Sequence, residues 1–74
     1  MTNRDLALKT GNLIKLIRKE KNISQENFAI DANISRRHMS SVENGKIDIK
    51  LVTLKKICLE LKISLPDFLA RVYS

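Results

Sequence analysis

Three serines stand at points where the chain is expected to enter a helix. Ser24, Ser35 and Ser64 each precede a short stretch whose apolar residues lie three or four positions apart. A serine hydroxyl placed there accepts a hydrogen bond from a free N–H group of the first turn, and apolar residues at this spacing share one helix face. No useful length of the chain alternates apolar and polar residues as a strand would. The pattern predicts short capped helices and an all-α fold.

The other boundaries follow from turn residues. Asn33 suits a left-handed turn between the second and third helices, and the pair at 44–45, Asn-Gly, is a strong helix stop. Lys50 is a poor N-cap, whereas Asp67 can complete a capping-box-like arrangement with the serine at 64. The expected helices are one that ends near residues 21–22, a two-turn helix after Ser24, one from Ser35 to Glu43, one from about Leu51 to Lys62, and one that begins at residues 64–67.

A chain of 74 residues is long enough for one small domain, which we place at residues 1–74. The sequence has two glycines, one proline and no internal repeat, so it offers no linker. Because the core of such a domain is small, burial against a second copy is expected to matter, and a homodimer is the first expectation for its assembly.

The charge balance favours a polyanionic partner. Fourteen lysines and arginines oppose eight acidic residues, for a formal net charge of +6. Nucleic acid is therefore expected before an anionic membrane surface. No run of apolar residues is long enough for a membrane span or a secretory signal peptide, so a cytoplasmic protein is expected. The single cysteine, Cys58, lies in a periodic apolar segment and is expected to pack in the core.

The third helix carries the most informative polar face. At about 100° per residue, Met39 falls on the opposite side from a polar arc, with Val42 beside it. The arc consists of Arg36, Arg37, Ser40 and Ser41, and His38 lies at its flank. Arginine can donate two hydrogen bonds to guanine, and serine is short enough for close approach to a base edge. By itself the arc fits an ordinary solvated face equally well.

Two short serine-capped helices joined by a tight turn are the layout of a helix-turn-helix. The stretch GNLIKLIRKEKNISQENFAIDANISRRHMSSVENGK resembles the Cro and phage-repressor type of helix-turn-helix, through its motifs Gly-x-x-Ile-x-x-x-Arg, Ser-Gln-Glu-x-x-Ala and Ser-x-x-x-x-Ser-x-x-Glu-x-Gly. With SLPDFL the resemblance extends from about residue 11 to residue 69. It implies a compact five-helix lambda-repressor-like domain, a helix-turn-helix at about 24–44, and a sequence-specific transcriptional regulator that reads operator DNA in the major groove with its third helix.

The resemblance also implies residue roles. Gln25 would contact the phosphate backbone at the start of the second helix, and Arg36 and Arg37 are the main expected base readers. Arg18 and Glu43 would form an ion pair that ties the first helix to the end of the third. The DNA-binding residues implied or expected are Gln25, Ser35, Arg36, Arg37, His38, Ser40, Ser41, Asn44 and Lys46.

The residues at about 51–74 are expected to form a dimer interface. They contain more apolar side chains than a small bundle can bury against itself. Leu59 and Ile63 lie one turn apart, as do Leu65 and Leu69, so each pair can continue a stripe that faces a partner. A two-fold dimer would place two recognition helices about 34–36 Å apart and require an inverted repeat in the operator.

Other functions are less compatible with the sequence. One histidine, one cysteine and two isolated glycines provide neither a metal site nor a phosphate loop, so no enzyme, cofactor or metal is expected. Three aromatic residues are too few for a stacking platform on RNA. The alternative is an antitoxin or interaction module whose main partner is another protein, although paired arginines on an exposed arc favour DNA.

Within the DNA-binding class the chain resembles, in its small size, restriction-modification controller proteins and small phage repressors. Antitoxins are similar in this respect too. A bacterial or phage-encoded regulator is expected. The sequence does not reveal the operator, the choice between activation and repression, or a contact with RNA polymerase or a toxin. Phe28 and Asn33 stand where this family more often has Leu and Gly, and residues 49–50 replace a common Pro-Ser pair, so the geometry of that loop is open.

Overall fold

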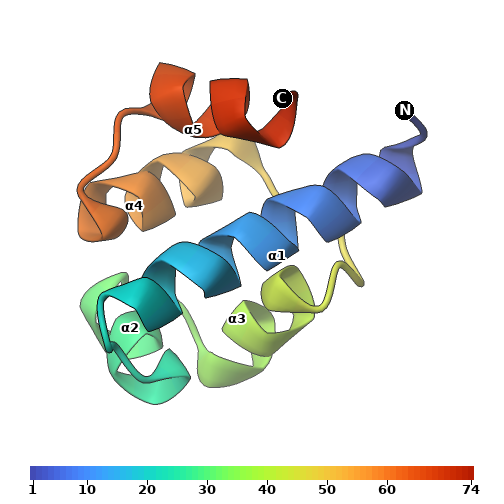
Figure 1. Cartoon of the computed structure of the whole chain (residues 1–74). Helices are drawn as coiled ribbons and strands as arrows, with labels where there is room; N and C mark the ends of the chain where they lie inside the picture. Colours follow the sequence, from blue (N-terminus) through green and yellow to red (C-terminus); the bar gives the residue numbers. More distant parts are fainter.

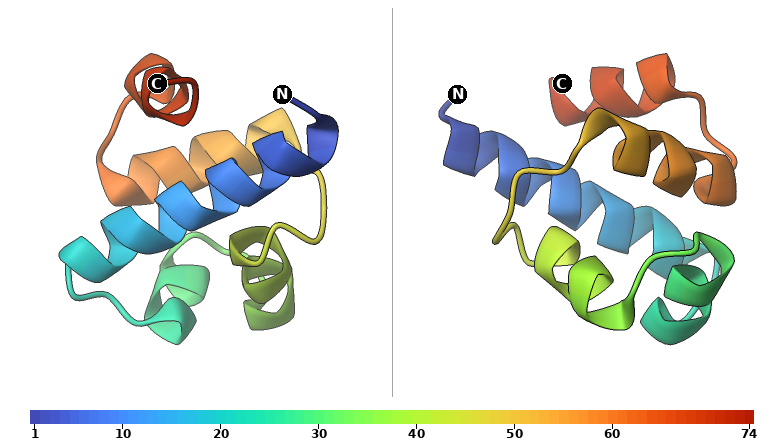
Figure 2. Two further views of the ribbon diagram at one scale, coloured as in Figure 1. Left: turned by 45° about the vertical axis from the view of Figure 1, so that its right-hand side comes forward. Right: turned by 180° about the vertical axis from the view of Figure 1, so that it is seen from behind.

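The computed structural model describes all residues, 1–74, and contains helices without strands. Its five helices are α1 (Asn3–Glu20), α2 (Gln25–Asp31), α3 (Arg36–Glu43), α4 (Leu51–Leu61) and α5 (Leu65–Val72). The helix α1 runs through the middle of the molecule, with α2 and α3 on one side and α4 and α5 on the other (Figures 1 and 2). The expected all-α fold of five helices is confirmed, although α1, with 18 residues, is longer than the short helices expected. None of the helices has the length and apolar character needed to cross a membrane.

The predicted serine caps are present at all three positions. The hydroxyl oxygens of Ser24, Ser35 and Ser64 each accept a hydrogen bond from the backbone N–H three residues later, at 3.1, 3.0 and 3.2 Å. The reciprocal bond that would complete a capping box at Ser64 is not formed. A complete capping box instead lies at Thr2 and Asp5, where it starts α1, and the sequence analysis did not predict it.

A residue with positive φ lies in each of the four connections between the helices. Asn33 (φ 57°) and Gly45 (φ 67°) lie at the two predicted turns. Asn22 and Lys62 also adopt φ 58°, and neither was predicted to be left-handed. Asparagine tolerates this conformation better than most residues, whereas lysine has no local feature that favours it. Lys50 makes no side-chain bond to α4, as its poor capping ability predicts.

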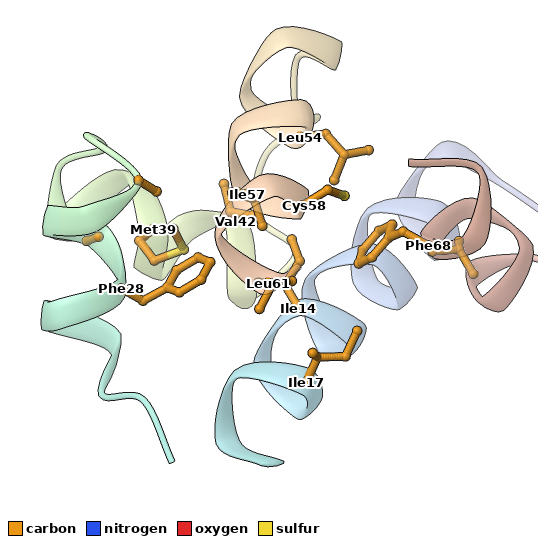
Figure 3. Packing of buried hydrophobic residues seen from close by; sticks show 13 residues of the cluster. Ile14, Ile17, Phe28, Met39, Val42, Leu54, Ile57, Cys58, Leu61 and Phe68 are labelled. Atoms are coloured by element: carbon orange, nitrogen blue, oxygen red, sulfur yellow. The ribbon is translucent and has the colours of Figure 1, made fainter. Parts of the chain in front are cut away.

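All five helices contribute to one core (Figure 3). The predicted inward residues of α3, Met39 and Val42, are buried, and Cys58 is 2% exposed within the cluster, as expected. Burial away from water raises the pKa of the Cys58 thiol, because the thiolate loses its hydration. The cluster comprises Ile14, Ile17, Phe28, Ala29, Ala32, Met39, Val42, Leu54, Ile57, Cys58, Leu61, Phe68 and Val72.

Glycine at position 11 sets how closely α1 approaches α3. A Cβ added to Gly11 would overlap the backbone carbonyl oxygen of Val42 and lie 2.9 Å from that of Glu43. Only a residue without a side chain permits this crossing. The contact fixes the C-terminal half of α3 against α1, so the opposite, polar side of α3 faces outward.

Candidate nucleic-acid interface

The outer face of α3 presents the polar residues that the sequence analysis placed there. Arg36, Arg37 and His38 are exposed, and Ser40 is half-buried, as is Ser41. On the inner face Met39 and Val42 are buried, at 0% and 3% exposure. Ser35 is exposed, and its hydroxyl is engaged in capping the helix. The helix therefore packs its apolar side into the core and offers donors to a ligand.

A shallow open depression collects most of the predicted residues. No apolar residue lines it, and three of its side chains are cationic. Every residue of the lining was singled out from the sequence. The lining comprises Gln25, Arg36, Arg37, Ser40, Ser41 and Lys46. A surface of this composition is suited to phosphate oxygens and the acceptor atoms of base edges.

Two predicted residues lie beside the depression. His38 is exposed on the flank of α3, outside the lining. Asn44 is the exposed C-cap of α3, and its Nδ2 atom donates to the hydroxyl oxygen of Ser40 at 3.4 Å. The arrangement keeps the Asn44 amide next to the polar face.

A buried ion pair lies beneath this surface. The Nε and Nη2 atoms of Arg18 donate to the Oε2 and Oε1 atoms of Glu43 at 2.7 and 2.9 Å. The remaining Nη1 atom donates to the backbone carbonyl oxygen of Ile23 at 2.7 Å. Arg18 is 5% exposed and Glu43 is 2% exposed. The bonds to Glu43 join α1 to the end of α3, which is the pairing that the resemblance implied, and the bond to Ile23 adds the loop after α1.

Gln25 occupies a different setting from the one expected. Its Nε2 atom donates to Oε1 of Glu43 at 3.1 Å, so the amide is attached to the buried ion pair and is half-buried. Its carbonyl oxygen and second amide hydrogen stay free of protein partners, and the residue still lines the depression. No pattern in the sequence indicated this bond, because its partners are 18 residues apart.

The structure adds two charged residues that sequence reasoning did not assign to the interface. Glu26 lies at the edge of the depression, with its Oε2 atom 3.9 Å from Nη1 of Arg36. Arg4, on α1, shares a second hollow with Asn44 and Lys46. Arg4 and Lys46 thus place two cations in this hollow, beside the acidic Asp48. The signal for Arg4 was its charge alone, which does not distinguish it from other surface cations.

The predicted dimer residues differ in their exposure. Leu59 is 67% exposed, whereas Ile63, Leu65 and Leu69 are partly buried against the core. At the other end of α4, Leu51 is 66% exposed, and near it are the exposed side chains of Val52 and Tyr73. A mostly apolar hollow lies there, between α1, α4 and α5. Of the four predicted dimer residues only Leu69 lines this hollow, so the outward apolar surface extends beyond the predicted set.

The chain matches known proteins over nearly its whole length. A family model described as a helix-turn-helix domain matches residues 11–74. Control protein C.MunI from Mycoplasma sp is 41% identical over 69 residues, which are 92% of this chain and 93% of that protein.

Two solved structures show the same arrangement of helices. The restriction-modification controller protein C.Esp1396I, solved as a tetramer with its natural 35 base-pair operator, has a TM-score of 0.84 and 29% identity, over 92% of this chain and 90% of that one. The restriction-modification controller protein C.AhdI from Aeromonas hydrophila has a TM-score of 0.80 and 27% identity, over 84% and 94% of the two chains.

Proposed function

The chain belongs to the helix-turn-helix domain family, and on that premise we propose that it is a transcriptional regulator of the restriction-modification controller type. It binds double-stranded operator DNA in a sequence-specific manner and catalyses no reaction. The observation that carries this proposal is the depression on α3, whose lining is entirely polar and includes three cations. The protein is bacterial or phage-encoded and acts in the cytoplasm.

Base reading is assigned to the first turn of α3. Arg36 and Arg37 are exposed there, at the N-terminal end of α3. In a helix-turn-helix the residues at this end of the recognition helix contact base edges in the major groove. Each guanidinium can donate two parallel hydrogen bonds to O6 and N7 of guanine. Ser40 and Ser41 line the same depression one turn later, where their short side chains permit close approach to the DNA.

Backbone contacts would hold this helix in register. Gln25 begins α2, where free backbone N–H groups and the positive end of the helix favour a phosphate. Lys46 and Asn44 flank the other end of α3 and can contact phosphates of the same half-site. The buried pair of Arg18 and Glu43 supports the reading face from below, so its side chains start from a rigid helix.

We assign the protein a homodimeric assembly on an inverted-repeat operator. Residues 1–74 form the domain, the helix-turn-helix spans about 24–44, and the dimer region lies within about 51–74. Leu59, Ile63, Leu65 and Leu69 are the proposed interface residues, of which Leu59 is the most exposed. C.Esp1396I, solved as a tetramer in complex with its operator, supports DNA binding by several copies. A two-fold dimer sets its reading helices about one DNA turn apart.

Selection of binding sites from random duplexes tests the function. The wild-type chain should enrich an inverted repeat, and the variant with both Arg36→Ala and Arg37→Ala should enrich none. Both arginines are exposed, so thermal unfolding should show that the variant remains folded. Failure of the folded wild-type chain to enrich any sequence would contradict the proposal and favour a protein-interaction module.

A further inference from the structure

The beginnings of α2 and α3 bring one acidic side chain next to a proposed base reader. Glu26 is the second residue of α2 and Arg36 is the first residue of α3. Oε2 of Glu26 lies 3.9 Å from Nη1 of Arg36, across the turn that joins the two helices. The side chains are 65% and 70% exposed, so both remain available to a ligand. Arg37, the neighbouring cation, has no such partner.

A carboxylate at this position is unfavourable for DNA affinity alone. It lies beside a cationic surface and would be near phosphate groups, which carry the same sign of charge. A negative charge in the first turn of α2 also stabilises that helix, yet this effect does not require a cation on α3. The pairing with Arg36 therefore indicates a second role for Glu26, which is to act on the side chain of Arg36.

The guanidinium group has enough donors to serve both partners. It presents N–H groups along more than one edge of a plane, and recognition of guanine uses only two of them. The contact with Glu26 involves Nη1, so donors at Nε and Nη2 remain for the base. A free arginine loses much rotamer freedom when it binds, and a partner that already restrains it reduces that loss.

We propose that Glu26 is a positioning residue for Arg36 and thereby sharpens its discrimination of one base in the operator. This inference rests on the proposed function. The carboxylate holds one edge of the guanidinium while another edge meets guanine, and the contact strengthens when DNA excludes water from it. Glu26 itself touches no base. Its contribution belongs to specificity, because DNA without a suitable base gains nothing from an oriented arginine.

The test compares Glu26→Gln with the wild-type chain on a single selected operator, on variants of that operator with one base pair changed, and on random duplexes. Arg36→Ala first identifies the position that Arg36 reads, as the one where discrimination is lost. At this position Glu26→Gln should reduce discrimination by roughly two- to fivefold, the range that corresponds to the coupling of an exposed ion pair. Discrimination elsewhere should stay the same, and affinity for random DNA should be unchanged or higher.

Asp31→Asn is the matched control, since it removes the same charge from the other end of α2. It should leave discrimination unchanged at every position. In the double variant, Glu26→Gln should have no further effect on discrimination once Arg36 is alanine. Thermal unfolding checks that each variant is folded.

The outcomes separate the two proposals. An equal loss on operator and random DNA would assign Glu26 only a role in helix stability and would overturn the inference. Unchanged discrimination in Glu26→Gln would overturn it as well, while the proposed function stands. If Arg36→Ala loses discrimination at no position, there is no reader to position and the inference is wrong. If the wild-type chain enriches no sequence, the proposed function fails and the inference fails with it.

Discussion

Replacing Glu43 with alanine removes one half of the buried ion pair and leaves the other half without a partner. Arg18 would lose two hydrogen bonds, of 2.7 and 2.9 Å, and would keep only the bond to the carbonyl oxygen of Ile23. Gln25 would lose its bond to the same carboxylate. Because Arg18 is 5% exposed, water cannot readily replace these partners. The cost of an uncompensated buried charge is about 3–5 kcal/mol.

This cost is large for a chain of this size. At roughly 0.05–0.15 kcal/mol per residue, 74 residues have a free energy of unfolding of about 4–11 kcal/mol. Glu43→Ala should therefore lose about a quarter or more of the free energy of unfolding, and in the lower part of the range the variant would be largely unfolded. Urea unfolding followed by circular dichroism measures the change, with Glu20→Ala as the control at an exposed acidic residue.

A double variant separates charge from packing. Arg18→Met with Glu43→Leu removes both charges and keeps apolar volume, so it should be more stable than Glu43→Ala alone. If Glu43→Ala changes the free energy of unfolding by less than about 0.5 kcal/mol, as a substitution at an ordinary surface site does, the reasoning is refuted. A double variant as unstable as the single one would refute it as well, since the loss would then come from packing and not from the unpaired arginine.

Four further predictions concern DNA binding, assembly and the thiol. Arg37→Ala should weaken binding to the operator by about 1–3 kcal/mol, with the loss confined to one base position. Competition with operator variants that have one base pair changed measures this loss. An equal loss on random DNA would show that Arg37 contacts a phosphate. Lys46→Ala should weaken binding to all duplexes alike and reduce the slope of log K against log salt by about 0.9, and an unchanged slope would exclude a phosphate contact. Leu59→Lys should shift the chain toward monomer in sedimentation at micromolar concentration, whereas dissociation by Leu51→Lys alone would move the interface to the other end of α4. Because burial raises the pKa of Cys58, its reactive thiolate is scarce at pH 8, and alkylation should be fast only after unfolding in urea; equal rates in both states would contradict its burial.

The helices and their ends were predictable because the interactions that define them are local. A cap such as Ser24 bonds to a backbone N–H three residues away, and Asn33 adopts its turn through its own backbone preference. The inward faces were predictable for the same reason, since helical spacing places Met39 and Val42 on one side of α3. The polar residues of the candidate interface were predictable because they occupy the opposite face of α3.

The sequence by itself determined which segments are helices, where the serine-capped ones begin, and which side of α3 is left for a ligand. Apart from the Arg18–Glu43 pair, which the family resemblance implied, only the tertiary structure decided the partners of side chains that lie far apart in the chain. It attached Gln25 to Glu43, 18 residues away, and brought Glu26 to Arg36 across the turn. It also decided which apolar residues of α4 are exposed, such as Leu59 and Leu51, and which are buried, such as Ile57. Periodicity reports the direction of a side chain on its own helix, whereas contact and burial depend on where the other helices pack.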